Sequence, residues 1–190
     1  MNLIALSFAI FLLGAQLIKR SFLERRSWIL AAASVTWVAL GGGVMSFILY
    51  RAWSGNSLAM NYLPPVTPIT YFLSYVGTRF FLAFGVSLVF AAIFVAAMML
   101  MNRRCGGKFF DHGEIAVAGS AIFLSGFPGV LFFIPALIVF YLFAHIINFI
   151  RGRKGERIPL FYLWLPVALS VILINNFWLS RLSIWALLKV

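Results

Sequence analysis

Six long apolar runs, separated by short polar gaps, determine what this 190-residue chain can fold into. An apolar run of about 18 residues or more indicates a membrane-spanning helix, because roughly 20 residues cover a ~30 Å hydrocarbon core. Backbone polar groups inside a bilayer must be bonded within the span, so helices are expected. We therefore predict an all-α, polytopic membrane bundle of about six transmembrane helices, forming a single domain over residues 1–190. The predicted spans are residues 2–18, 28–50, 79–101, 112–127, 128–150 and 159–178.

The composition agrees with a lipid bilayer as the surroundings of the chain. Hydrophobic residues make up 64% of the sequence and charged residues 10%, whereas a soluble domain carries roughly 25% charged residues. The net charge of +11 raises the question of a nucleic-acid partner. However, the basic residues do not form a face with interleaved aromatics, so no nucleic-acid binding is expected.

The basic residues instead predict the orientation in the membrane. Most of them lie in three gaps between apolar runs, at residues 19–26, 103–108 and 151–157. Six spans place these three gaps on the same side, and an excess of Lys and Arg marks the cytoplasmic side. The chain is therefore predicted to start outside, cross six times and end outside.

The longest exterior segment is predicted at about residues 51–78. Its prolines forbid a continuous helix through residues 64–68. Its Trp and Tyr side chains suit the headgroup region of a membrane. Two forms remain open for residues 67–77, a short interfacial helix or an ordinary connecting loop.

Carboxylates are the side chains to explain, because a charge inside a bilayer is costly. The chain has four acidic residues, and only Glu114 lies directly against the start of an apolar run. A carboxylate at a helix N-terminus is favoured by the helix dipole. One interpretation is therefore that Asp111 and Glu114 cap a helix, and the other is that Glu114 takes part in catalysis or binding.

The sequence around Glu114 resembles the membrane domain of the type IV prepilin peptidases, aspartic endopeptidases of the type IV pilus system. In that family a Gly-x-Gly-Asp motif follows a basic gap and opens a helix rich in small residues. Here Asp111-His112-Gly113-Glu114 occupies that place. The family's basic loop ending in Ile-Pro is similar to residues 151–159, Arg-Gly-Arg-Lys-Gly-Glu-Arg-Ile-Pro. The resemblance covers about residues 80–178.

The resemblance implies a multi-pass protein of the bacterial or archaeal inner membrane, which is the plasma membrane. It also implies a catalytic pair that departs from the family pattern. The family's second carboxylate lies near the cytoplasmic end of an earlier helix, where this chain has Gln16. Aspartic peptidases need two carboxylates that share a proton, and an amide cannot accept a proton at neutral pH. Glu114 replaces the motif aspartate, and its extra methylene displaces the carboxylate by ~1 Å, enough to cost ~10²-fold in rate.

These departures leave enzymatic activity open and predict impaired or absent proteolysis. If the chain is an enzyme, Asp111 is the first candidate for the second carboxylate and Glu24 the other, with Gly113 and His112 beside the substrate. If it is not, the same site binds prepilin-like or other membrane segments at the cytoplasmic face. A non-catalytic membrane scaffold or transporter subunit is the alternative function. No metal or cofactor is predicted, because Asp-His-x-Glu is not an established ligand spacing.

Overall fold

The computed structural model describes residues 2–107, 109–151 and 159–177. These residues form helices and no strand, which confirms the predicted all-α class. The α-helices are α1 (Asn2–Ile18), α2 (Arg20–Arg25), α3 (Ser27–Ser54), α4 (Ile69–Val76), α5 (Leu82–Arg104), α6 (His112–Ser125), α7 (Gly129–Ile150) and α8 (Trp164–Phe177). Short turns of 3-10 helix, η1 (Ala59–Tyr62) and η3 (Leu160–Tyr162), and a π-helical segment, η2 (Gly77–Phe81), complete the described structure.

Four helical segments in the described part are long and apolar enough to cross a membrane. They are α3, the continuous helix Ile69–Arg104, α7 and the segment Leu160–Phe177. The apolar helices α1 and α6 are shorter. The structure thus supports a membrane protein and has a helix in each of the six predicted ranges, while the crossing of the membrane by all six remains a prediction.

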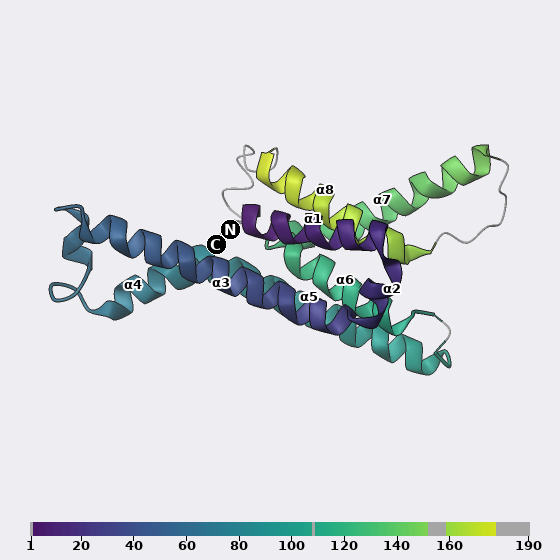
Figure 1. The fold of residues 1–190 in the computed structure, drawn as a ribbon, viewed down its shortest axis with the longest axis horizontal. Helices are drawn as coiled ribbons and strands as arrows, with labels where there is room; N and C mark the ends of the chain where they lie inside the picture. Colours follow the sequence, from purple (N-terminus) through teal and green to yellow (C-terminus); the bar gives the residue numbers. More distant parts are fainter. Residues whose placement is uncertain (1, 108, 152–158, 178–190) are drawn as a thin grey trace.

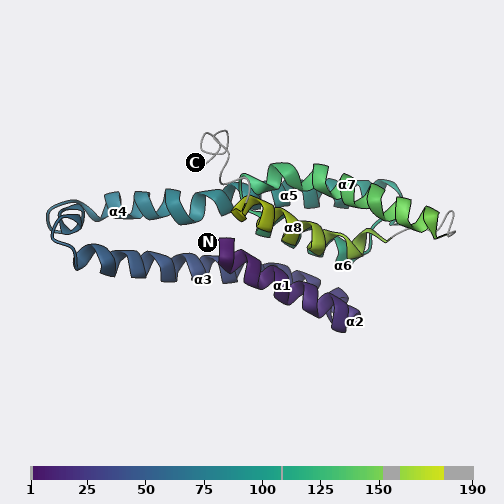
Figure 2. The same ribbon diagram turned by 90° about the horizontal axis from the view of Figure 1, so that it is seen from above.

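Helix α6 lies at the centre of the bundle. It contacts α1, α2, α3, α5, α7 and α8, and Figure 2 shows α6 and α8 between α1 and α3 on one side and α5 and α7 on the other. A helix that is apolar all round is expected to be buried, and residues 115–118 and 121–124 are buried. Small side chains let its neighbours approach closely. A Cβ added at Gly119 would lie only 2.7 Å from a side-chain carbon of Val95 in α5.

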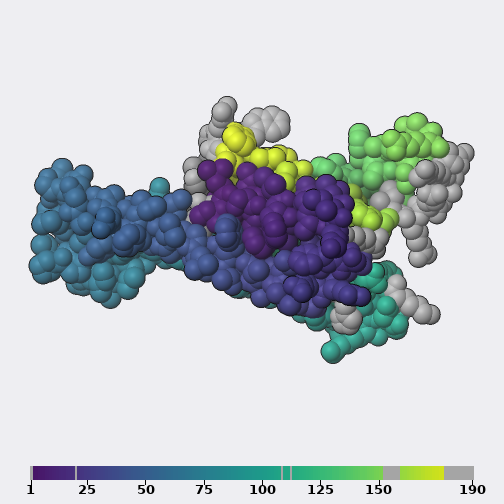
Figure 3. Space-filling model, viewed as in Figure 1, coloured from purple at the N-terminus to yellow at the C-terminus, as the bar shows by residue number. Residues whose placement is uncertain are grey.

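The outer part of α3 and helix α4 form an arm that projects from the bundle (Figures 1 and 3). Of the two forms predicted for residues 67–77, the helix is the one present. It does not end before the third predicted span, because η2 joins α4 to α5. Aromatic packing holds the arm together, with the Trp53 ring 5.5 Å from Phe72 and 5.1 Å from Tyr75 between centroids. Such pairs stabilise beyond the area they bury.

Helices α1 and α3 pack closely at a glycine. The indole Nε1 of Trp37 in α3 donates a hydrogen bond to the carbonyl of Ile4 in α1, at 3.2 Å. One turn further, a Cβ added at Gly41 would lie 2.5 Å from Cδ1 of Ile4. The absence of a side chain at Gly41 therefore permits this contact.

Replacing Gly41 with valine should destabilise the packing of α1 on α3 by about 1–3 kcal/mol, the usual range for an overpacked contact. The measurement is reversible unfolding in mixed micelles with increasing sodium dodecyl sulfate. Gly43→Val is the matched control, because a Cβ at Gly43 meets nothing within 4 Å. Equal unfolding free energies for the two variants would contradict the assigned role of Gly41.

Candidate functional site

Glu114 lies in the first turn of α6, with its side chain 9% exposed. Its Oε1 accepts a hydrogen bond from the indole Nε1 of Trp164, at 3.1 Å. Trp164 is the first residue of α8 and is buried. The carboxyl group of the central helix is therefore bonded to the start of the last described helix.

Gln16 lies near the end of α1 and is 2% exposed. Its Nε2 donates a hydrogen bond to the carbonyl of Phe161, at 2.6 Å. Its Oε1 is buried and has no hydrogen-bond partner in the described part of the structure. An unpaired buried acceptor costs about 1–3 kcal/mol. The chain thus holds a polar side chain here at the expense of its own stability.

The structure brings Gln16 and Glu114 to the same short segment, residues 161–164, although they are far apart in the sequence. Gln16 bonds the Phe161 carbonyl and Glu114 bonds the Trp164 indole. Their helices also contact each other. The two positions that the resemblance assigns to the catalytic pair therefore contact one short segment, Gln16 at η3 and Glu114 at the start of α8.

The other predicted site residues lie around the start of α6. Asp111 is exposed, occupies the N-cap position and makes no capping hydrogen bond with its side chain. Because α6 begins at His112, Asp111 does not share a helical face with Glu114. The side chain of His112 lies outside the described part of the structure.

The space beside Gly113 is taken up by α2. A Cβ at Gly113 would lie 3.2 Å from both the Cα and the carbonyl oxygen of Glu24. The glycine therefore allows the backbones of α2 and α6 to meet. Of the two candidates for a second carboxylate, the half-buried Glu24 is packed beside α6, and Asp111 is exposed.

Two aromatic rings set the orientation of Trp164. The Phe133 ring is stacked on it at 6.2 Å with an interplanar angle of 4°, and the Phe94 ring meets it edge-on at 5.9 Å. Phe94 and Phe133 also line an apolar groove of about 210 Å³ between α5 and α7, with Ile122 of α6 contributing to its wall. The rings thus connect a membrane-facing groove, through Trp164, to Glu114.

Trp164 is a residue of the site that was not predicted from the sequence. An indole at the end of an apolar run is also typical of the aromatic belt at a membrane surface. Its position, just after the basic segment that ends in Ile-Pro, was the available signal. A single sequence does not reveal that its N–H is directed inward to a carboxyl group.

Basic side chains are concentrated at this end of the bundle. Figure 1 shows α2, the end of α5 and the end of α7 at the same end of the molecule. The described basic residues there include Lys19, Arg25, Arg26, Arg103, Arg104 and Arg151. Cys105, which follows α5, is exposed beside them.

No protein-family model, curated protein or solved structure matches this chain.

Within the described ranges, no group of three or more His, Cys, Asp or Glu side chains is placed to hold a metal ion. The described side chains that meet at residues 161–164 are one buried carboxyl group, one amide and an indole N–H.

Replacing Trp164 with phenylalanine should keep ring packing against Phe133 but remove the donor to Glu114. The expected loss in unfolding free energy is about 1–3 kcal/mol, because a buried carboxyl oxygen then loses the hydrogen bond donated by the indole. Trp37→Phe is the control, since it also removes one indole donor, from a bond at an exposed site. A loss no larger than that of Trp37→Phe would show that the bond to Glu114 contributes little.

Proposed function

We propose that this chain is a prepilin peptidase-like membrane protein that binds pilin-like membrane segments at the cytoplasmic face with impaired or no proteolysis. The observation that supports the proposal is the meeting of Gln16 and Glu114 at residues 161–164. These are the positions at which the family resemblance requires two acids. One of them is an amide.

The chemistry of the pair favours binding over hydrolysis. Peptide hydrolysis by this class needs one carboxylate to activate water and a second acid to polarise the carbonyl. An amide does neither, but its oxygen accepts hydrogen bonds from peptide N–H groups. The Oε1 of Gln16, which has no hydrogen-bond partner in the described part of the structure, is therefore the acceptor assigned to the backbone of a bound segment, and because it is buried the helices around it must move apart for that segment to reach it.

The groove between α5 and α7 supplies a route to the site from the bilayer. Its lining is almost entirely apolar, with Phe90 and Phe94 on one side and Leu131 and Ile134 on the other. Helices associate in lipid through close van der Waals packing. A partner helix lying over this groove, with side chains inserted into it, would bring its cytoplasmic end toward Trp164 and Glu114.

The same proposal includes six membrane crossings with the N-terminus outside. The segment containing α6 is fixed to α5 at both ends, by a bond from Asn102 Nδ2 to the Phe110 carbonyl and one from the Phe127 N–H to the Ala83 carbonyl. Residues 83 to 102 of a helix span roughly 29 Å, close to a ~30 Å hydrocarbon core. Helix α1, with 17 residues, also reaches the lower end of the spanning range of about 17–25 residues.

A transporter subunit is the less favoured alternative. Transport through a bundle requires polar groups along a route at the middle of the bilayer. The hydroxyls of Ser34, Ser87 and Ser120 instead bond carbonyls of their own helices. These three hydroxyls therefore take part in hydrogen bonds within their own helices.

The orientation can be tested with the single cysteine of the chain. Cys105 is exposed and should react with a membrane-impermeant maleimide only after the cytoplasmic side is made accessible, for example in inverted vesicles. A Cys105→Ser/Ser57→Cys variant moves the thiol to the far end of α3 and should be labelled in intact cells. Labelling of Cys105 from outside would overturn the proposed orientation.

The activity can be tested by co-expression with a type IV prepilin, followed by mass analysis of the pilin. Wild-type protein should leave the precursor uncut, and Gln16→Asp combined with Glu114→Asp should produce trimming, because two aspartates can then share a proton. Each single substitution is the control and should not suffice. Wild-type trimming that stops in Glu114→Ala would overturn the assignment of impaired proteolysis.

Binding is measured separately in the same cells. A photo-crosslinking residue replacing Phe94, in the α5–α7 groove, should capture the uncut prepilin, and the same residue replacing the exposed Trp37 should not. Equal capture at the two positions would show that the groove does not guide the segment. Absence of capture at both would overturn the proposed partner.

A further inference from the structure

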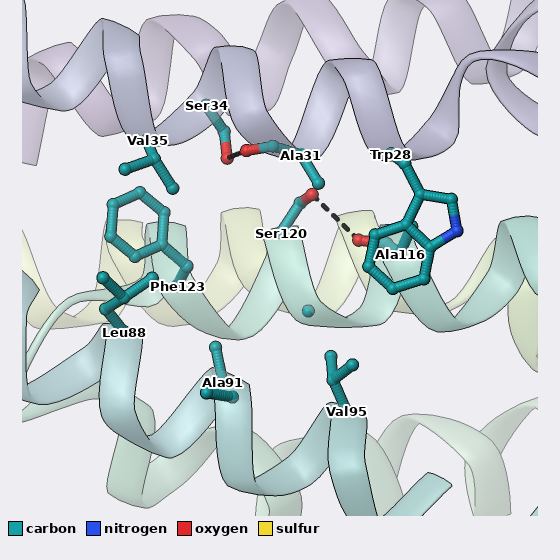
Figure 4. A pocket seen from close by; sticks show the side chains of 12 residues that line it. Trp28, Ala31, Ser34, Val35, Leu88, Ala91, Val95, Ala116, Ser120 and Phe123 are labelled. Atoms are coloured by element: carbon teal, nitrogen blue, oxygen red, sulfur yellow. Dashed lines mark hydrogen bonds between the residues drawn. The ribbon is translucent and has the colours of Figure 1, made fainter. Parts of the chain in front are cut away.

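A second groove lies on another side of α6, between α3 and α5, and has no part in the proposed function. Both helices pack against α6 but make little contact with each other. The resulting space measures about 180 Å³. Figure 4 shows Trp28 at one end of the groove and Phe123, Val35 and Leu88 at the other.

The groove presents hydrocarbon to its occupant. No polar atom contributes to its accessible lining surface. The two serines beside it are turned back on their own helices: Ser34 Oγ donates to the Ala31 carbonyl at 2.6 Å and Ser120 Oγ to the Ala116 carbonyl at 2.9 Å. A polar ligand would therefore find no matching group here.

The size of the groove suits a single hydrocarbon chain. An apolar cavity of about 150 Å³ holds one benzene ring, so this space matches a stretch of roughly six to eight carbons. A whole helix is ~10–12 Å across with its side chains and would cover the groove without filling it. Left empty, the lining would lose dispersion contacts on its open side.

Basic residues at one end of the groove indicate that the lipid has an anionic headgroup. Arg25 and Arg26 are exposed and precede Trp28 by three and two residues. The Arg26 guanidinium lies over the Phe22 ring, 5.4 Å from its centroid. Tryptophan and arginine next to each other at the end of an apolar run are typical of the headgroup layer, where basic residues attract anionic lipid.

We propose that the α3–α5 groove binds one acyl chain of an anionic phospholipid whose phosphate lies against Arg25 and Arg26. The lipid completes the packing between α3 and α5, which make little contact with each other along this stretch. It is a structural ligand on the bilayer-facing surface, separate from the site at Glu114.

Native mass spectrometry of the purified full chain tests this proposal. The protein is exchanged into detergent with equal amounts of dioleoyl phosphatidylglycerol and dioleoyl phosphatidylcholine, which share acyl chains and differ in headgroup charge. The expected result is one retained phosphatidylglycerol, preferred by about fivefold for each arginine that contacts it. Equal retention of the two lipids by wild-type protein would overturn the proposal.

Matched variants locate the lipid. Ala31→Leu fills the groove and should lower phosphatidylglycerol occupancy about threefold or more, because many dispersion contacts are lost together. Ala32→Leu adds the same side chain at an exposed position that does not line the groove and should leave occupancy unchanged. Equal occupancy in the two variants would overturn the assignment to this groove.

Substitution of Arg25 and Arg26 tests the contact with the lipid headgroup. Arg25→Gln with Arg26→Gln should abolish the preference for phosphatidylglycerol. Arg51→Gln, which removes a guanidinium lying 5.7 Å over the Phe47 ring at the far end of α3, should preserve it. A preference that survives the first change, or is lost in the second, would overturn the headgroup assignment.

Tryptophan fluorescence locates the lipid without use of the groove-filling variant Ala31→Leu. Phosphatidylglycerol brominated in its acyl chain should quench tryptophan emission, and Trp28→Phe should remove the larger part of the quenching. Trp37→Phe is the control, since Trp37 lies on α3 outside this groove. Quenching that persists in Trp28→Phe and falls in Trp37→Phe would place the chain elsewhere and overturn the proposal.

Discussion

The burial of α6 is the constraint on which the rest of the structure depends. This helix carries mainly small and aliphatic side chains, and the small ones let other helices approach it closely. Helices α1, α3, α5, α7 and α8 do so. Because α6 is central, the residue in its first turn, Glu114, is held inside the bundle at its basic end. The site is therefore a consequence of how the core is packed.

The positions of the helices could be predicted from the sequence because apolar runs and basic gaps are strong local signals. The runs at residues 2–18 and 128–150 correspond closely to α1 and α7. The continuation of α4 into α5 could not be predicted, since the pattern near residues 67–77 fits an interfacial helix or a loop equally well. The arm formed by the outer part of α3 and α4 depends on contacts between Trp53 and aromatic side chains that follow it in the chain by about 20 residues. No local pattern predicts such contacts.

The candidate site was predictable only in part. Glu114 stands out because a carboxylate at the start of an apolar helix is costly. Gln16 had no signal of its own, and only a family resemblance singled it out. Its contact with the Phe161 carbonyl joins α1 to η3, the turn before the last described helix, and such long-range contacts are not encoded in any local pattern. The resemblance placed Gly113 beside a substrate, and in the structure a Cβ at this position would meet the backbone of Glu24.

The π-helical segment η2 has a mechanical consequence. It makes Ile69–Arg104 one rod of 36 residues, which is ~54 Å long at the rise of an α-helix. The aromatic arm lies at one end of this rod, and the arginines beside Cys105 lie at the other. Helix α5 in turn contributes Phe94, whose ring meets that of Trp164. One unbroken stretch of helix therefore runs from the aromatic arm to the surroundings of the buried acid.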